Sequence, residues 1–138
     1  MCKLLTALFV LAFIGFAEAR EIVSYGGEMT SFIAQTRHYQ ATGEELRLRV
    51  CNSACTMFLS ANACVYPNTR MMFHKAFKSN DPNGSERLYD STGEYYDSVL
   101  MSHYPYGVQQ LLGGYLTAEG VVLNGRQLIT AGVRQCVR

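Results

Sequence analysis

The chain has 138 residues, a formal net charge of +1 and only 17% charged residues, and no basic tract stands out. A nearly neutral chain of this kind gives a nucleic-acid partner no electrostatic support, so we expect no nucleic-acid binding. Its length is sufficient for one compact domain and too small for two. No cofactor motif is recognised, and we expect no cofactor.

The N-terminal segment has the pattern of a secretory signal peptide. Lys3 precedes an apolar run over 4–16, and a small-x-small site ending at Ala19 follows. The run is shorter than the roughly 20 residues of a membrane-spanning helix. We therefore predict a signal peptide over 1–19, cleaved after Ala19, and a single periplasmic or secreted domain over 20–138. An uncleaved N-terminal anchor is the alternative, and only then would the chain be attached to a membrane.

The first predicted elements alternate between strand and helix. A short strand is predicted over 21–25, ended by Gly26-Gly27, and an amphipathic helix over 28–42. The regular alternation of aliphatic residues with arginine over 46–50 predicts a strand with one buried face. A helix is expected next, over 53–61.

The rest of the chain continues in the same way. We predict a short strand over 64–66, a turn at Pro67-Asn68 and a buried strand over 70–74. The C-terminal half is predicted to contain a polar loop over 79–86, helices over 89–102 and 106–116, a short helix over 127–131 and a last strand over 133–137. Strands that alternate with helices indicate an α/β fold with a mainly parallel sheet.

Ser53 and His74 are the residues best suited to chemistry. Ser53 stands at a predicted helix start, where the helix dipole and free N–H groups stabilise a developing negative charge. His74 ends an apolar strand 21 residues later, and it is suited to be the general base for Ser53. A backbone N–H of Gly26-Gly27 would complete an oxyanion hole, because glycine permits close approach. In the alternative interpretation, Ser53 is only a helix N-cap and His74 a structural histidine.

The cysteines favour disulfides. Those that follow the predicted leader are Cys51, Cys55, Cys64 and Cys136. An even number in an exported chain predicts two disulfides and leaves their pairing open. These cysteines and His74 match no common zinc spacing, so we expect no metal. A thiol enzyme that uses Cys51 or Cys55 with His74 is a further hypothesis, and it requires a free thiol.

Several of these residues together resemble the proteolytic subunit of the Clp protease. In that family a Gly-Gly turn, a serine at a helix start and a P-N-x-R-x-M-x-H strand follow one another in this order. The matching stretches here are Gly26-Gly27, Ser53-Ala54 and PNTRMMFH over 67–74. The C-x-S-A-C variant is similar to exported, ClpP-like proteins of the crotonase superfamily. The resemblance extends over 22–76 and implies a ClpP/crotonase-like parallel sheet flanked by helices.

The resemblance also implies roles for single residues. The family's third catalytic residue is an aspartate well after the histidine, and the corresponding place in this chain offers Glu119 or, as an alternative, Asn124. The implied roles are nucleophile for Ser53, base for His74, third catalytic residue for Glu119, and oxyanion donors for Ala54 and for Gly26 or Gly27.

The chain also departs from the family. The mature chain would begin almost at the Gly-Gly strand, so the first β-α-β portion of the family is missing and the fold is N-terminally reduced. This leaves an exposed edge strand, which a partner or a second copy of the chain would cover.

Two functions follow from these patterns. The first is an exported serine hydrolase, a peptidase or esterase that acts on a peptide or ester through a Ser53-His74 acyl-enzyme mechanism. The alternative is a catalytically inactive, disulfide-stabilised ClpP-like binding or assembly module. The sequence specifies no substrate.

Overall fold

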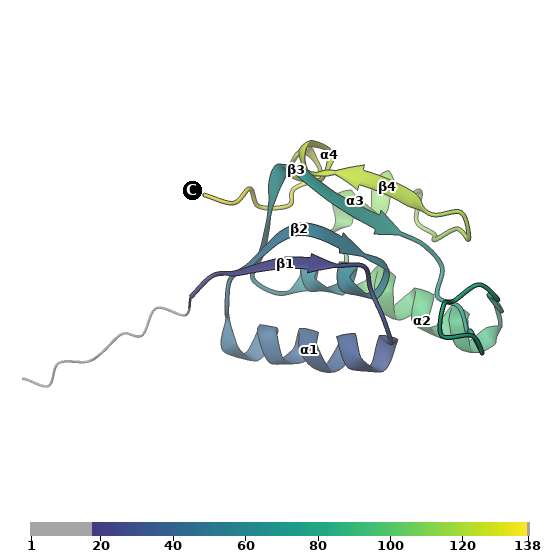
Figure 1. Ribbon diagram of the computed structural model, residues 1–138. Coiled ribbons are helices and arrows are strands. Elements are labelled where there is room, and N and C mark those ends of the chain that lie inside the picture. Colours follow the sequence, from purple (N-terminus) through teal and green to yellow (C-terminus); the bar gives the residue numbers. More distant parts are fainter. Residues whose placement is uncertain (1–17, 138) are drawn as a thin grey trace, which may run out of the picture.

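The fold is built on one four-stranded sheet. The computed structural model describes residues 18–137 and places the strands in the order β1-β2-β3-β4 (Figure 1). The strands β1 (Arg20–Ser24), β2 (Leu46–Asn52) and β3 (Ala63–Phe73) are parallel, and β4 (Val121–Asn124) runs antiparallel to β3. The predicted α/β class with a mainly parallel sheet is therefore confirmed.

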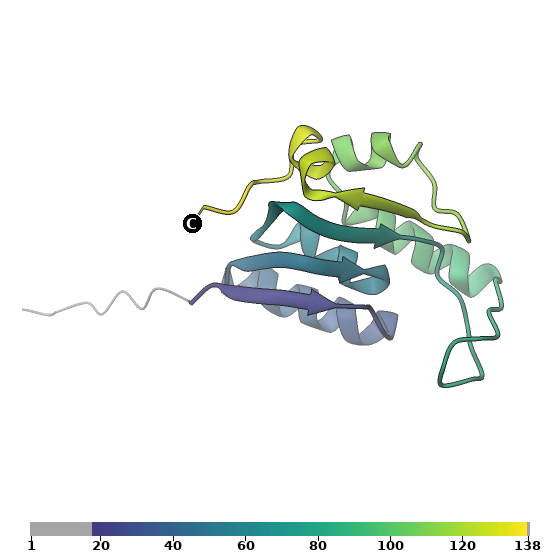
Figure 2. The same cartoon turned by 45° about the horizontal axis from the view of Figure 1, so that its top comes forward.

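Helices flank this sheet. They are α1 (Met29–Thr42), the 3-10 helix η1 (Ser53–Ser60), α2 (Ser91–Ser102), α3 (Tyr106–Leu111) and α4 (Gly125–Thr130). Figure 2 shows α1, α2 and α3 behind the same side of the sheet. The side chains that fill the space between sheet and helices include the fully buried Leu46, Leu48, Met71, Phe73, Leu100 and Val108. This core fixes the carboxyl ends of the strands relative to α2.

The N-terminal half follows the predicted pattern. A strand and a helix lie where the 21–25 and 28–42 predictions place them, and α1 ends at Gly43, whose φ is 69°. The predicted alternation in β2 is confirmed at Leu46 and Leu48, which are fully buried, and at the exposed Arg49, but the register shifts after Leu48 and leaves Val50 half-buried. A glycine at 43 suits the left-handed conformation that closes a helix.

The turn predicted at Pro67-Asn68 is wrong, since β3 continues through it. The pairing with β2 moves from Leu48↔Val65 to Val50↔Arg70, so residues 66–69 form a bulge. The Thr69 hydroxyl donates to the Leu48 carbonyl and accepts from the Tyr66 N–H at 2.9 Å. Thr69 therefore replaces ladder hydrogen bonds that the bulge removes, and proline is tolerated there because it needs no N–H partner.

The C-terminal third contains further corrections. The helix predicted over 106–116 ends at Leu111, shortly before Gly113 and Gly114, both with positive φ. The strand β4 was not predicted, and the expected strand over 133–137 is only an isolated bridge between Val65 and Gln135. The last helix begins at Gly125 because Asn124 and Gln127 form a capping box there.

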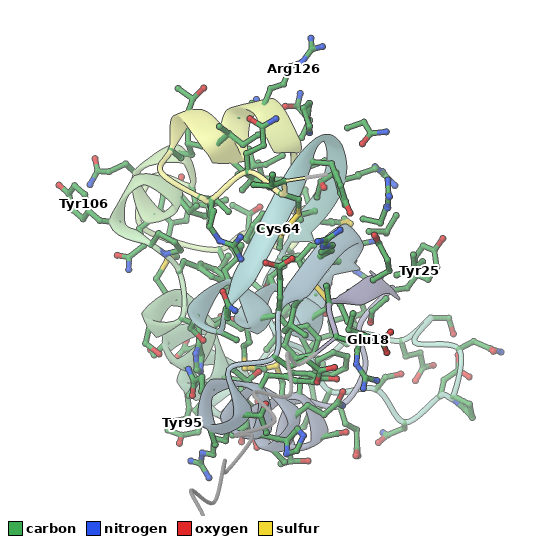
Figure 3. All side chains as sticks on the ribbon, turned by 90° about the vertical axis from the view of Figure 1, so that its left-hand side faces the viewer. Glu18, Tyr25, Cys64, Tyr95, Tyr106 and Arg126 are labelled. Atoms are coloured by element: carbon green, nitrogen blue, oxygen red, sulfur yellow. A yellow bond between two sulfur atoms is a disulfide. The ribbon has the colours of Figure 1, made fainter. Side chains whose placement is uncertain are left out.

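The cysteines form two disulfides, as predicted. Cys51 is bonded to Cys55, and Cys64 is bonded to Cys136, across 72 residues of sequence. Figure 3 labels Cys64 among the side chains of the molecule. Disulfides are typical of chains that leave a reducing cytosol. The predicted leader, 1–19, falls almost entirely outside the described residues, and none of the helices within 18–137 has the length and apolarity of a membrane span.

Candidate functional site

Ser53 has an unusual backbone conformation. It is the first residue of η1, directly after β2, and its φ of 57° is the only positive φ of a non-glycine residue among residues 18–137. Such a conformation costs about 1–3 kcal/mol and concentrates at functional sites. The N-cap of η1 is Asn52, so the interpretation of Ser53 as a helix N-cap is wrong. A sharp, strained strand-to-helix turn is also how many hydrolases expose a nucleophilic serine.

Two sets of contacts hold this turn. The Cys51–Cys55 disulfide encloses Ser53, and the Thr56 hydroxyl donates to the Ser53 carbonyl at 2.6 Å. The Tyr104 hydroxyl oxygen lies 2.6 Å from the Thr56 hydroxyl oxygen. Because the single Thr56 proton is directed at the carbonyl, Tyr104 is the donor to Thr56. Burial raises the pKa of Tyr104, which keeps this hydroxyl protonated. Sequence reasoning identified neither Thr56 nor Tyr104, since neither belongs to a motif.

Gly26 lies directly against Ser53. Its φ is 95°, and a Cβ added to it would lie 2.6 Å from the Ser53 Cβ and 3.2 Å from the Ser53 Oγ. Only glycine fits both the conformation and the space. The Gly26 N–H already donates to the Ser24 hydroxyl at 3.2 Å, which leaves Gly27 as the other candidate for the predicted backbone donor. Ala54, in the first turn of η1, is the next residue after Ser53, where helix N–H groups lack helical acceptors.

His74 follows β3 and is 9% exposed. Its Nδ1 lies 2.7 Å from the carbonyl oxygen of Lys75. A carbonyl only accepts, so Nδ1 is the donor in this hydrogen bond, and no hydrogen bond within residues 18–137 occupies Nε2, which can accept a proton when the ring is neutral. The ring also stacks on Phe77, with centroids 5.8 Å apart, and Gly120 is packed so closely that an added Cβ would lie 3.1 Å from the His74 Cβ. A ring that carries its proton on Nδ1 and leaves Nε2 to accept one is the tautomer that a general base requires.

One cleft of about 830 Å³ brings four of the predicted residues together, whereas its lining includes neither Ala54, which is fully buried, nor Glu119. Its lining includes Gly26, Gly27, Ser53 and His74. Within the described residues no hydrogen bond joins the Ser53 hydroxyl to the His74 ring. Such bonds are often long in an empty site and shorten when a substrate binds.

The loop predicted over 79–86 forms one wall of this cleft. Asp81 organises it, because its carboxylate accepts from the Ser85 hydroxyl and from the backbone N–H groups of Asn83 and Ser85. These hydrogen bonds lower the pKa of Asp81. Lys78 pairs with Asp90 at 2.8 Å and ties the loop to the start of α2.

Glu119 is exposed, and no hydrogen bond within residues 18–137 connects it to His74. The adjacent Gly120, and not Glu119, makes the close contact with His74. The assignment of Glu119 as a third catalytic residue stays a prediction.

A second serine–histidine pair serves as an internal comparison. The Ser60 Oγ lies 2.7 Å from the His103 Nδ1. The Ser60 hydroxyl, however, donates to the Met57 carbonyl at 2.8 Å, so His103 must be the donor in the pair. Burial lowers the pKa of His103. Ser60 therefore has its proton directed away from a base and lacks the arrangement of a nucleophile.

The thiol-enzyme hypothesis is wrong, because Cys51 and Cys55 are bonded to each other and neither has a free thiol. Cys64 and Cys136 are also bonded to each other, so none of the four cysteines that follow the predicted leader has a free thiol. Among residues 18–137, no group of three or more histidine, cysteine or acidic side chains is arranged to hold a metal ion.

No family model matches this chain, and no curated protein matches it. The resemblance to the Clp protease subunit therefore stays a prediction.

Proposed function

We propose that this protein is an exported serine hydrolase of ClpP/crotonase-like fold, a peptidase or esterase that acts through an acyl-enzyme. One observation carries the proposal: Ser53, held at a positive φ where a strand meets a helix, lines the same cleft as His74, whose Nε2 is free to accept a proton. The residue order shared with the Clp protease subunit and the close contact of Gly26 with Ser53 support the same assignment.

The mechanism uses groups of this chain and one water molecule. The Ser53 Oγ attacks the acyl carbon while His74 Nε2 accepts its proton, and the backbone N–H groups of Gly27 and Ala54 stabilise the oxyanion. When the tetrahedral intermediate collapses, the bond to the amine or alcohol breaks and His74 returns the proton to that leaving group. Water, deprotonated by His74, then attacks the acyl carbon. The bond to the Ser53 Oγ breaks, His74 returns the proton to that oxygen, and the carboxylic acid product leaves.

The two disulfides favour a location outside the cytosol, in the periplasm or the medium. The predicted signal peptide supports the same location. Substrates would accordingly be peptides or esters of those compartments.

The test is labelling with a fluorophosphonate, from which the Ser53 Oγ displaces fluoride, read by intact mass. We expect one adduct on the wild type and on Ser60→Ala, which removes the serine of the comparison pair. We expect none on Ser53→Ala and strongly reduced labelling of His74→Gln. Equal labelling of wild type and Ser53→Ala would contradict the proposal, whereas a folded wild type that does not react would favour the second function below.

A catalytically inactive binding or assembly module is the second candidate, and the β1 edge favours it. Val23 of this edge strand is 63% exposed, and Tyr25, the residue directly after β1, is 75% exposed and projects outward (Figure 3). An edge strand with apolar side chains is a template for strand pairing with a partner or a second copy. We expect cross-linking to yield a complex that Val23→Lys abolishes; a purely monomeric wild type with no cross-linked species would contradict this function.

A further inference from the structure

The peptide group between Lys75 and Ala76 is hydrogen-bonded at both ends. Its carbonyl oxygen, on Lys75, accepts from His74 Nδ1 at 2.7 Å. Its N–H, on Ala76, donates to the Asp97 Oδ1 at 2.6 Å. A single planar amide therefore lies between the imidazole of the candidate base and a carboxylate of α2.

We propose that Asp97 is the third member of this site and acts on His74 through the intervening peptide group. The inference rests on the proposed function, and it makes Asp97 a positioning residue, since its carboxylate does not touch the ring. A hydrogen bond to a carboxylate is roughly twice as strong as one between neutral groups. It polarises the amide, so the Lys75 carbonyl becomes a better acceptor for the Nδ1 proton.

The consequence for the reaction is electrostatic. When His74 accepts the Ser53 proton, the ring becomes positive and Nδ1 donates more strongly to the Lys75 carbonyl. The Asp97 charge stabilises that state through the polarised amide, and no proton moves to Asp97. In serine hydrolases with a direct aspartate, the carboxylate fulfils the same two tasks, fixing the tautomer and stabilising the imidazolium.

The helix α2 is built to hold this contact. Gly93 lies one turn before Asp97 on the same face, and a Cβ added to it would lie 2.8 Å from the Ala76 carbonyl oxygen. Thus α2 approaches Ala76 by its backbone at Gly93 and by its side chain at Asp97. The helix start is itself fixed, because the Asp90 side chain accepts from the Gly93 N–H at 3.0 Å.

Glu119, the acid that the resemblance indicates, lacks these properties. It is exposed, while Asp97 is half-buried and its Oδ1 already has a short bond into the His74 segment. Sequence reasoning missed Asp97 because it sought an acid near the C-terminus and because the link is made through a backbone amide.

The first test is Asp97→Asn, whose amide oxygen can still accept from Ala76 while the charge is lost. We expect the maximal rate of fluorophosphonate inactivation to fall about tenfold, with the concentration for half-maximal rate unchanged. The matched control is Glu94→Gln, an exposed acid on the same helix, and we expect wild-type kinetics for it. Wild-type kinetics for Asp97→Asn would overturn the inference.

A second readout does not depend on reactivity. In histidine-labelled protein, NMR of the wild type should show neutral His74 protonated at Nδ1, with a downfield Nδ1 proton signal assigned by its loss in His74→Gln. In Asp97→Asn this signal should move upfield. A neutral His74 protonated at Nε2 in the wild type, or an unmoved signal in a folded Asp97→Asn, would overturn the inference. If Ser53 fails to react and the signal still moves, the hydrolase proposal fails and the coupling between Asp97 and His74 stands.

Discussion

Replacing both Cys51 and Cys55 with alanine removes their disulfide. This change should lower the reactivity of Ser53 far more than the small size of the closed loop would suggest. The two cysteines are four residues apart and enclose Ser53, the residue with the strained φ of 57°. Both sulfurs belong to fully buried side chains, so the bond restrains the turn from inside the core.

The stability cost follows from the size of each closed loop. The chain-entropy relation assigns about 2 kcal/mol to a loop as short as that between Cys51 and Cys55, and about 4 kcal/mol to the 72-residue separation of Cys64 and Cys136. On stability alone, loss of Cys64–Cys136 should therefore be the more damaging change.

Reactivity should show the opposite order. A left-handed non-glycine residue costs about 1–3 kcal/mol, and once the disulfide is absent the turn can relax and recover that energy. Each 1.4 kcal/mol is about tenfold in rate, so labelling of Ser53 should fall about 5- to 150-fold. The Cys64→Ala/Cys136→Ala variant should label at the wild-type rate at any temperature where it is folded.

The assay is the rate of fluorophosphonate labelling beside a urea melt, for wild type and both double variants. An unchanged labelling rate in folded Cys51→Ala/Cys55→Ala would refute the idea that this disulfide holds the nucleophile. Equal losses of reactivity in the two double variants would show that only global stability matters.

Two further predictions concern the surroundings of the site. Gly26→Ala should abolish labelling of Ser53, because the new Cβ would lie 2.6 Å from the Ser53 Cβ. The control is Gly132→Ala, at φ 100° with nothing within 4 Å, which should only lower the melting temperature. Equal labelling of the two variants would count against the close contact. Lys78 and the Gly93 N–H lower the pKa of Asp90 in the folded protein below its ordinary value of 3.8. The Asp90 carboxylate therefore stabilises the fold above pH 3.8, and this stabilisation is lost as the pH falls through the lowered pKa of the folded protein. Urea melts should therefore show wild type more stable than Asp90→Asn near neutral pH and the difference vanishing in strong acid; a difference that persists there would contradict the charge effect.

Local patterns were sufficient to predict the β1-α1-β2 unit. Alternation in 46–50 placed Leu46 and Leu48 on the buried face, and the glycine at 43 marked the end of α1. These features depend on neighbours in sequence, which periodicity and capping describe well.

Features that depend on distant partners could not be predicted in this way. Pro67-Asn68 looks like a turn in isolation, but Thr69 supplies a hydrogen bond to Leu48 that lets β3 continue. The strand β4 is only four residues long and pairs with β3 from about 50 residues away in the chain, so no local pattern marks it.

The candidate site likewise combines residues that the local sequence marks with residues that act through distant contacts. Ser53, His74 and Gly26 are visible in the sequence because each ends or begins an element, and the parallel sheet then brings strand ends to one edge. Their restraints come from elsewhere: Asp97 holds the segment after His74, and Tyr104 holds Thr56 and, through it, the Ser53 carbonyl. Both restraining residues lie in α2 or directly after it. A displacement of this one helix would therefore disturb the nucleophile and the base together, which makes the position of α2 the structural requirement on which the proposed activity depends.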